Sequence, residues 1–97
     1  MTVKWSSQAR KDLKAIHAYI ARDSQVYARG QIARIVERVE KVSHRPTAGH
    51  PVHEYPELPL KEVHAGNYRI IYAFAEDQFH VLTVIHMKQQ LARNRLR

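Results

Sequence analysis

Apolar residues recur at the spacing of an α-helix near the start of the chain. They are Ala9, Leu13, Ile16 and Ile20. Intervals of four, three and four residues place these side chains on one face of a helix. Ser6 or Ser7 can cap this helix, because a serine hydroxyl accepts a backbone N–H that has no partner in the first turn. The pattern therefore predicts an amphipathic helix that begins at this serine pair.

A second apolar stripe follows the polar interruption ARDSQ. Its members are Ala28, Ile32, Ile35, Val36, Val39 and Val42. Ser24 can cap this helix, and Pro46 ends it because proline lacks the N–H that a helix needs. A short connection between two one-sided helices predicts an antiparallel helical hairpin, and each helix needs an apolar surface to cover.

Four segments have the apolar alternation or the composition of β-strands. They are TVKW (2–5), LPLKEVHA (58–65), NYRIIYAF (67–74) and FHVLTVIH (79–86). Hairpin-type connections separate the last three. We therefore predict an α+β fold with the order β-α-α-β-β-β, in which the helical hairpin packs on a small, mostly antiparallel sheet. The chain length predicts one domain, residues 1–97. The C-terminal stretch MKQQLARNRLR contains good helix formers, so a short C-terminal helix is also expected as a possibility there.

Strand alternation divides the segment NYRIIYAF into two faces. Tyr68, Ile70, Tyr72 and Phe74 share the bulky face, which we expect to support the helices. Arg69 points to the other face with smaller neighbours, which we expect to be the less covered one. A buried arginine usually has a carboxylate partner, and Glu62 of the preceding strand is one candidate. An anion-binding role for Arg69 is the alternative, and residue chemistry alone does not separate the two. For the segment FHVLTVIH, strict alternation would put Phe79, Val81, Thr83 and Ile85 on one face.

Composition narrows the class of protein. The chain has no cysteine, which excludes disulfides and thiolate zinc sites, and no run approaches the ~20 apolar residues of a membrane span. We expect a cytoplasmic protein. Sixteen Lys and Arg against nine Asp and Glu give a net charge of +7. The excess favours an anionic partner, either nucleic acid or an acidic protein, over a purely solubilising role. The segment from Lys88 to Arg97 contributes four basic residues and no acidic one.

The residue types present allow two kinds of active site to be considered, a metal-free ribonuclease site and a metal site. A metal-free ribonuclease needs a general base, a general acid and cations, and Arg69, Lys61, His64 and His86 could supply them if they meet on one sheet face. The cluster His50-Pro-Val-His53-Glu54 has two histidines without a convincing third ligand, so we expect no metal and no cofactor. The basic tail is a further candidate contact for nucleic acid, or a solvated end.

Taken together, several stretches resemble the RelE/ParE superfamily of bacterial toxins, and more closely its ParE branch. They are VKWSSQARKDLKAIHAYIA, RPTAGHPV, LPLKEVHAGNYRIIYAF and VLTVIH. The resemblance spans nearly the whole chain. It implies the toxin of a type II toxin–antitoxin pair, with a helical hairpin on an antiparallel sheet. Its partner would be a small, ParD-like antitoxin, which we expect to be acidic.

The resemblance also implies candidate residues. ParE-like members are associated with inhibition of DNA gyrase, whereas RelE-like members cut messenger RNA on the ribosome. Arg69 matches the strand arginine that RelE-like nucleases use against phosphate, and Lys61 lies where a basic residue is common. The stretch HMKQQ that begins at His86 lacks the arginine and tyrosine of nuclease members, and it also departs from the His-x-Arg-Arg run of ParE relatives.

We therefore expect a toxin that inhibits DNA gyrase by binding to it and that is not an enzyme. The alternatives are a ribosome-dependent endoribonuclease that uses Arg69, Lys61 and His86, and an inactive scaffold that only binds its antitoxin. The expected target-binding residues are basic: Arg69, Lys88, Arg93, Arg95 and Arg97. Neither the antitoxin-binding surface nor the oligomeric state follows from the sequence.

Overall fold

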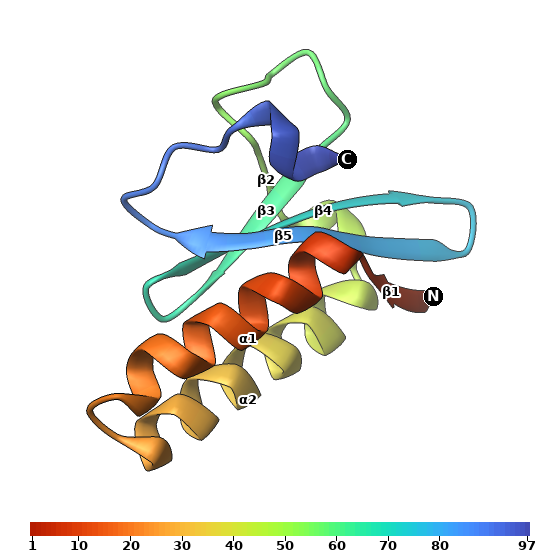
Figure 1. The fold of residues 1–97 in the computed structure, drawn as a ribbon. Coiled ribbons are helices and arrows are strands. Elements are labelled where there is room, and N and C mark those ends of the chain that lie inside the picture. The colour runs from red at the N-terminus through yellow and green to blue at the C-terminus, as the bar shows by residue number, and fades with distance from the viewer.

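The computed structural model describes all 97 residues as two helices packed on a five-stranded sheet, followed by a short C-terminal turn (Figure 1). The strands are β1 (Thr2–Trp5), β2 (His50–Pro51), β3 (Lys61–Ala65), β4 (Tyr68–Ala75) and β5 (Gln78–His86). The helices are α1 (Ser7–Ala21) and α2 (Gln25–Ser43), and the 3₁₀ turns are η1 (Pro46–Ala48) and η2 (Arg93–Leu96). The α+β prediction is confirmed. The tail forms a 3₁₀ turn and not an α-helix.

Serine caps set the start of both helices. The Ser6 hydroxyl accepts the Ala9 N–H at 2.9 Å, and the Ser24 hydroxyl accepts the Tyr27 N–H at 3.1 Å. Each bond satisfies a donor that the first helical turn leaves free. Figure 1 shows the two helices side by side along one face of the sheet. Val36 belongs to the predicted apolar stripe of α2 but is 45% exposed.

The sheet order is β1-β5-β4-β3-β2, so the first strand lies at one edge and the short β2 at the other. β1 runs parallel to β5, while all other neighbours are antiparallel. β2 was not predicted, because two residues are too few to show a pattern. β5 carries a register shift opposite Ile71 and Tyr72, where one extra residue is inserted. The bulge places Val81 and Val84 in the same core cluster, so the predicted strict alternation of β5 is wrong.

Apolar side chains form a separate cluster on each side of the sheet. The larger cluster joins the helices to the face of β4 that carries Ile70 and Tyr72, as predicted. The smaller one consists of Val52, Leu60, Ile71, Ile85 and Leu91. The Arg69 face is the less covered of the two, as expected, but it is not open to solvent, since Arg69 is only 3% exposed. The loop between β2 and β3 and the C-terminal segment lie across that face, opposite the helices (Figure 1).

Candidate functional site

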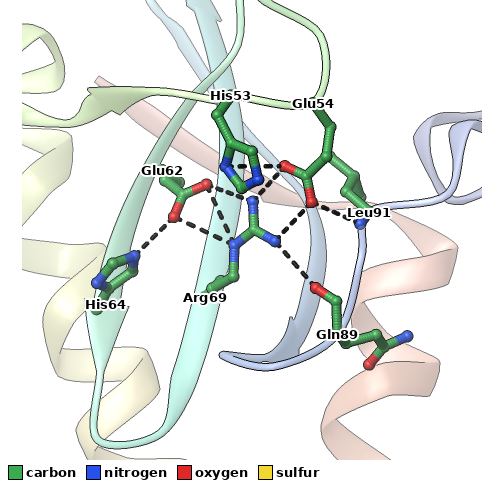
Figure 2. Close-up of polar contacts among 7 residues, drawn as sticks. All are labelled: His53, Glu54, Glu62, His64, Arg69, Gln89 and Leu91. Atoms are coloured by element: carbon green, nitrogen blue, oxygen red, sulfur yellow. Dashed lines mark hydrogen bonds and ion pairs between the residues drawn. The ribbon is translucent and has the colours of Figure 1, made fainter.

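The Arg69 side chain lies at the centre of a buried ion-pair network on the second face of the sheet (Figure 2). Arg69 is only 3% exposed. Its Nη2 donates to Glu62 Oε1 at 2.6 Å and to Glu54 Oε1 at 2.7 Å, and its Nη1 donates to Glu54 Oε2 at 2.8 Å. Nη1 also donates to the Gln89 carbonyl at 3.0 Å, and Nε lies 3.2 Å from both oxygens of Glu62. All five N–H donors of the guanidinium therefore have partners inside the protein.

Strand register explains how the local part of this network forms. His64 lies directly opposite Arg69 in the β3–β4 ladder, and Glu62 lies opposite Ile71, so Glu62 and Arg69 are diagonal neighbours on one face. His64 Nε2 is 2.6 Å from Glu62 Oε2. Of the two alternatives considered for Arg69, the structure shows the pairing with Glu62.

Glu54 comes from the loop between β2 and β3, and its carboxylate accepts hydrogen bonds both from β4 and from the chain after β5. Besides its two bonds from Arg69, Oε2 accepts the backbone N–H of Leu91 at 2.8 Å. His53 Nδ1 lies 3.4 Å from Oε1. Figure 2 shows this carboxylate between the guanidinium and the chain at Leu91. Sequence reasoning placed Glu54 only in a doubtful metal cluster, and the partners Gln89 and Leu91 were missed because they use backbone atoms.

The charges in this network are held in their ionised forms. The hydrogen bond from Arg69 is the main cause that lowers the pKa of Glu54 from 4.5 to about 2. Burial alone would raise the pKa of Glu62, but hydrogen bonds from Arg69 and His64 outweigh it and lower that pKa. The hydrogen bonds to both carboxylates raise the pKa of Arg69, so the guanidinium is permanently charged. The arrangement is therefore a stable ion cluster and offers no free cation in this conformation.

The residues expected for a nuclease do not share one face. Lys61 lies opposite Tyr72 and His86 opposite Tyr68, and both tyrosines lie on the helix-covered side. Arg69 and His64 lie on the other side. The expectation that all four meet on one face is thus wrong for Lys61 and His86 and holds only for His64. The His86 ring packs edge-on against Tyr68 with centroids 5.6 Å apart.

Comparison with known proteins places the fold in a family. The model of a family described as "ParE toxin of type II toxin-antitoxin system, parDE" matches residues 3–91. The chain belongs to the ParE toxin family. It is 32% identical over 90 residues to "Putative toxin Y4kP" of Sinorhizobium fredii. This alignment covers 91% of this chain and 90% of that protein. The predicted membership of the ParE branch, and with it of a type II toxin–antitoxin system, is confirmed.

A solved structure has the same fold. It is titled "Chromosomal ParDE TA system from P. aeruginosa", and it matches with a TM-score of 0.74 over 91% of this chain and 97% of that chain. The sequence identity is 20%, so this likeness supports the fold and not the details of the site. The helical hairpin on a small sheet is therefore the architecture that this ParE toxin shares with that chain.

The basic side chains of the toxin's C-terminal tail (residues 87–97) differ in their exposure and in the ion pairs that they form. Lys88 and Arg97 are exposed. Arg93 stacks over the Tyr55 ring at 4.6 Å from the centroid and lies 3.1 Å from Glu57 Oε2, yet its side chain is 61% exposed. The tail therefore presents cations to solvent while part of it is fixed to the body of the toxin.

Arg95 belongs to a second polar network that joins the toxin's tail to α1. Its Nη1 donates to Asp12 Oδ1 at 2.8 Å. The other oxygen of this buried carboxylate accepts the Val84 N–H at 2.9 Å and the Thr83 hydroxyl. β1 pairs with β5 only as far as Val81, so Asp12 satisfies a strand N–H beyond the end of that pairing. Gln8 also donates to Asp12 Oδ1, at 2.8 Å within the same helix. The partners outside α1 were not predicted, because they lie 71 or more positions away from Asp12.

A groove of about 540 Å³ runs between α1 of the toxin and the end of the β4–β5 hairpin. Its lining is mainly apolar and aromatic and includes Ile16, Tyr19, Ile20, Tyr68, Val84 and His86. Such a surface suits the apolar side chains of a peptide or protein partner.

No group of three or more His, Cys, Asp or Glu side chains is placed to hold a metal ion. Of the cluster considered from sequence, Glu54 is taken up by Arg69. No helix has the length and apolar character that crossing a membrane requires.

Proposed function

We propose that this ParE-family toxin acts by binding DNA gyrase and not by cutting RNA. The observation that carries the proposal is the saturation of Arg69. Its five donors already bind Glu54, Glu62 and the Gln89 carbonyl, so a phosphate could reach the guanidinium only by displacing at least one of these partners. Family membership supports the choice of gyrase, because the ParE branch is the one associated with that target.

The separation of the other candidate residues supports the same conclusion. A metal-free nuclease needs a proton donor, a proton acceptor and a cation around one phosphate. Lys61 and His86 lie on the opposite side of the sheet from Arg69, so they do not converge with its guanidinium. The exposed cations Lys88, Arg93 and Arg97 remain as target contacts, which need position and charge but no proton transfer.

The same surface chemistry supports an acidic, ParD-like antitoxin as the neutralising partner. A toxin of net charge +7 attracts an acidic chain, and complementary charge accelerates association. The apolar groove between α1 and β5 offers the anchoring surface that charge alone does not supply. A gyrase target would place the toxin in the bacterial cytoplasm.

Two parallel reactions test the proposal. The purified toxin is added to a gyrase supercoiling reaction and, separately, to ribosomes translating a defined message. We expect loss of supercoiling, intact message and release of the inhibition by the antitoxin. The variant Lys61→Ala should inhibit gyrase as the parent does, because this nuclease candidate is not a proposed contact and lies outside the tail. Message cleavage with normal supercoiling would overturn the proposal.

A further inference from the structure

The network around Arg69 joins three segments that are distant in the sequence. Glu54 belongs to the loop between β2 and β3, Arg69 belongs to β4, and Gln89 and Leu91 belong to the chain after β5. The two bonds to this last segment use its backbone, the carbonyl of Gln89 and the N–H of Leu91 (Figure 2). The network therefore fixes the path of the chain after β5.

Few other polar contacts tie this segment to the body of the toxin. The Met87 N–H donates to the Asn67 carbonyl at 2.8 Å, at the very end of β5. Further along, the contacts come from side chains, Arg93 to Glu57 and Arg95 to Asp12. Residues 87–92 lie outside every helix and strand. The Lys88 and Gln89 N–H groups donate only to the adjacent His86, to its ring Nδ1 at 3.1 Å and to its carbonyl at 2.9 Å. Beyond this local turn, the bonds from Arg69 and Glu54 are the ones that tie the backbone of residues 88–92 to distant parts of the chain.

Burial of Leu91 depends on the same path. Leu91 is 3% exposed and packs in the small apolar cluster on the second face of the sheet. Its own N–H is the one that Glu54 accepts, so the hydrogen bond and the apolar contact fix the same residue. A buried N–H without an acceptor is unfavourable, so losing Glu54 disfavours this position of Leu91.

We infer that Arg69 and Glu54 form a latch that holds residues 87–97 against the sheet and thereby positions the segment's exposed basic side chains for their target. The second half of this statement rests on the proposed function. Arg69 is a positioning residue here, because its buried guanidinium touches the segment's backbone and not the target. The cations that reach solvent, Lys88, Arg93 and Arg97, lie on either side of the latched residues.

The test begins with hydrogen exchange on the full-length toxin carrying Glu54→Ala. We expect exchange at the Leu91 amide to accelerate at least about tenfold more than at buried amides of α2 such as Ile35, which report any global loss of stability. Glu37→Ala is the matched control, because Glu37 forms an exposed pair with Lys41 on α2. Unchanged exchange at Leu91 would overturn the latch.

A double-mutant cycle then asks whether the latch acts through the tail. The second change neutralises the exposed cations in the full chain: Lys88→Gln, Arg93→Gln and Arg97→Gln. We expect Glu54→Ala to weaken gyrase inhibition about tenfold with the natural tail and to add little once the tail is neutral. Equal effects in both backgrounds, or no loss of inhibition despite faster exchange, would overturn the positioning role.

Failure of the gyrase assignment is distinguishable from failure of the latch. If the parent toxin leaves supercoiling intact, the proposed target is wrong. The same cycle is then scored by growth inhibition in cells, which presupposes no target, and exchange at Leu91 still judges the latch. Glu54→Asp provides a rescue arm: a shorter carboxylate that still accepts the Leu91 N–H should recover part of both protection and toxicity.

Discussion

Replacing Arg69 with leucine would leave the Glu54 and Glu62 carboxylates without their cation. The side chains of both glutamates are only 9% exposed, so water cannot take over the role of the guanidinium. Removing one partner of a buried ion pair costs roughly 3–5 kcal/mol, because the charge that stays behind is uncompensated. A second route gives a similar figure. The pKa of Glu54 is lowered from 4.5 to about 2, which corresponds to about 3 kcal/mol of stability at neutral pH.

The cost of this substitution should depend on pH with a definite sign. In the parent, both carboxyl groups have lowered pKa values, so their stabilising contribution is complete above the ordinary pKa of 4.5 and is lost as the pH falls through the lowered values, which for Glu54 is about 2. In the Arg69→Leu variant, burial without a cation raises the same pKa values above those of the unfolded chain. The variant therefore gains stability as the pH falls, and the difference from the parent narrows.

Urea unfolding measures this difference at pH 7 and at pH 5. The fluorescence of Trp5, the single tryptophan, reports the transition. We expect the variant to lose about 3–5 kcal/mol at pH 7 and clearly less at pH 5. Arg93→Leu is the control, because the pair of Arg93 with Glu57 is exposed and such pairs contribute under about 1 kcal/mol. A loss below about 1 kcal/mol, or one that is equal at both pH values, would refute the reasoning.

A neutral version of the cluster separates charge from shape. The triple variant Arg69→Met, Glu54→Gln and Glu62→Gln removes all three charges while keeping side chains of similar size. No buried charge is then left without a partner, so we expect the triple variant to recover a large part of what Arg69→Leu loses at pH 7. Stability as low as that of Arg69→Leu would show that uncompensated charge is not the cause of the loss.

Two further predictions concern local backbone structure. Ser6→Ala removes the cap of α1 and the bond to the Leu82 carbonyl, and it should cost about 1–2 kcal/mol in urea unfolding; a loss within error of zero would contradict the capping role. Gly66→Ala places a Cβ 2.7 Å from the Gln31 amide at a φ of +60°, and a loss of about 1 kcal/mol or more is expected. Replacing Gly66 with asparagine, which tolerates this φ better, should give a smaller loss unless the clash dominates.

Local sequence rules predicted the helices and most strands because the relevant forces act over a few residues. The cap at Ser24 and the stripe of α2 are set within single helical turns, and both are found as predicted except for the exposed Val36. The pairing of β1 with β5 was beyond such reasoning, since a parallel partner 76 positions away leaves no local pattern. The bulge in β5 was missed for a different reason. Its single extra residue is visible only once the register of both strands is known.

The network around Arg69 was only partly predictable for the same physical reason. Glu62 could be named because it lies on the neighbouring strand of a short hairpin. Glu54 comes from a loop whose path no periodicity fixes. The acceptor on Gln89 and the donor on Leu91 are backbone groups. Every residue type except proline has both a backbone N–H and a backbone carbonyl, so the amino-acid types in the tail do not identify these two positions.

The placement of a buried arginine on the second face follows from what covers that face. The helices supply the larger apolar cluster, whereas the loop and the tail supply a cluster of only five buried residues. Apolar contact is not directional, so a cluster this small leaves the path of an irregular segment weakly defined. A guanidinium with five fixed donors specifies where Glu54 and the Gln89 carbonyl must lie. In this ParE-family toxin, the strand arginine thus defines one arrangement of the irregular segments where apolar packing alone would permit several.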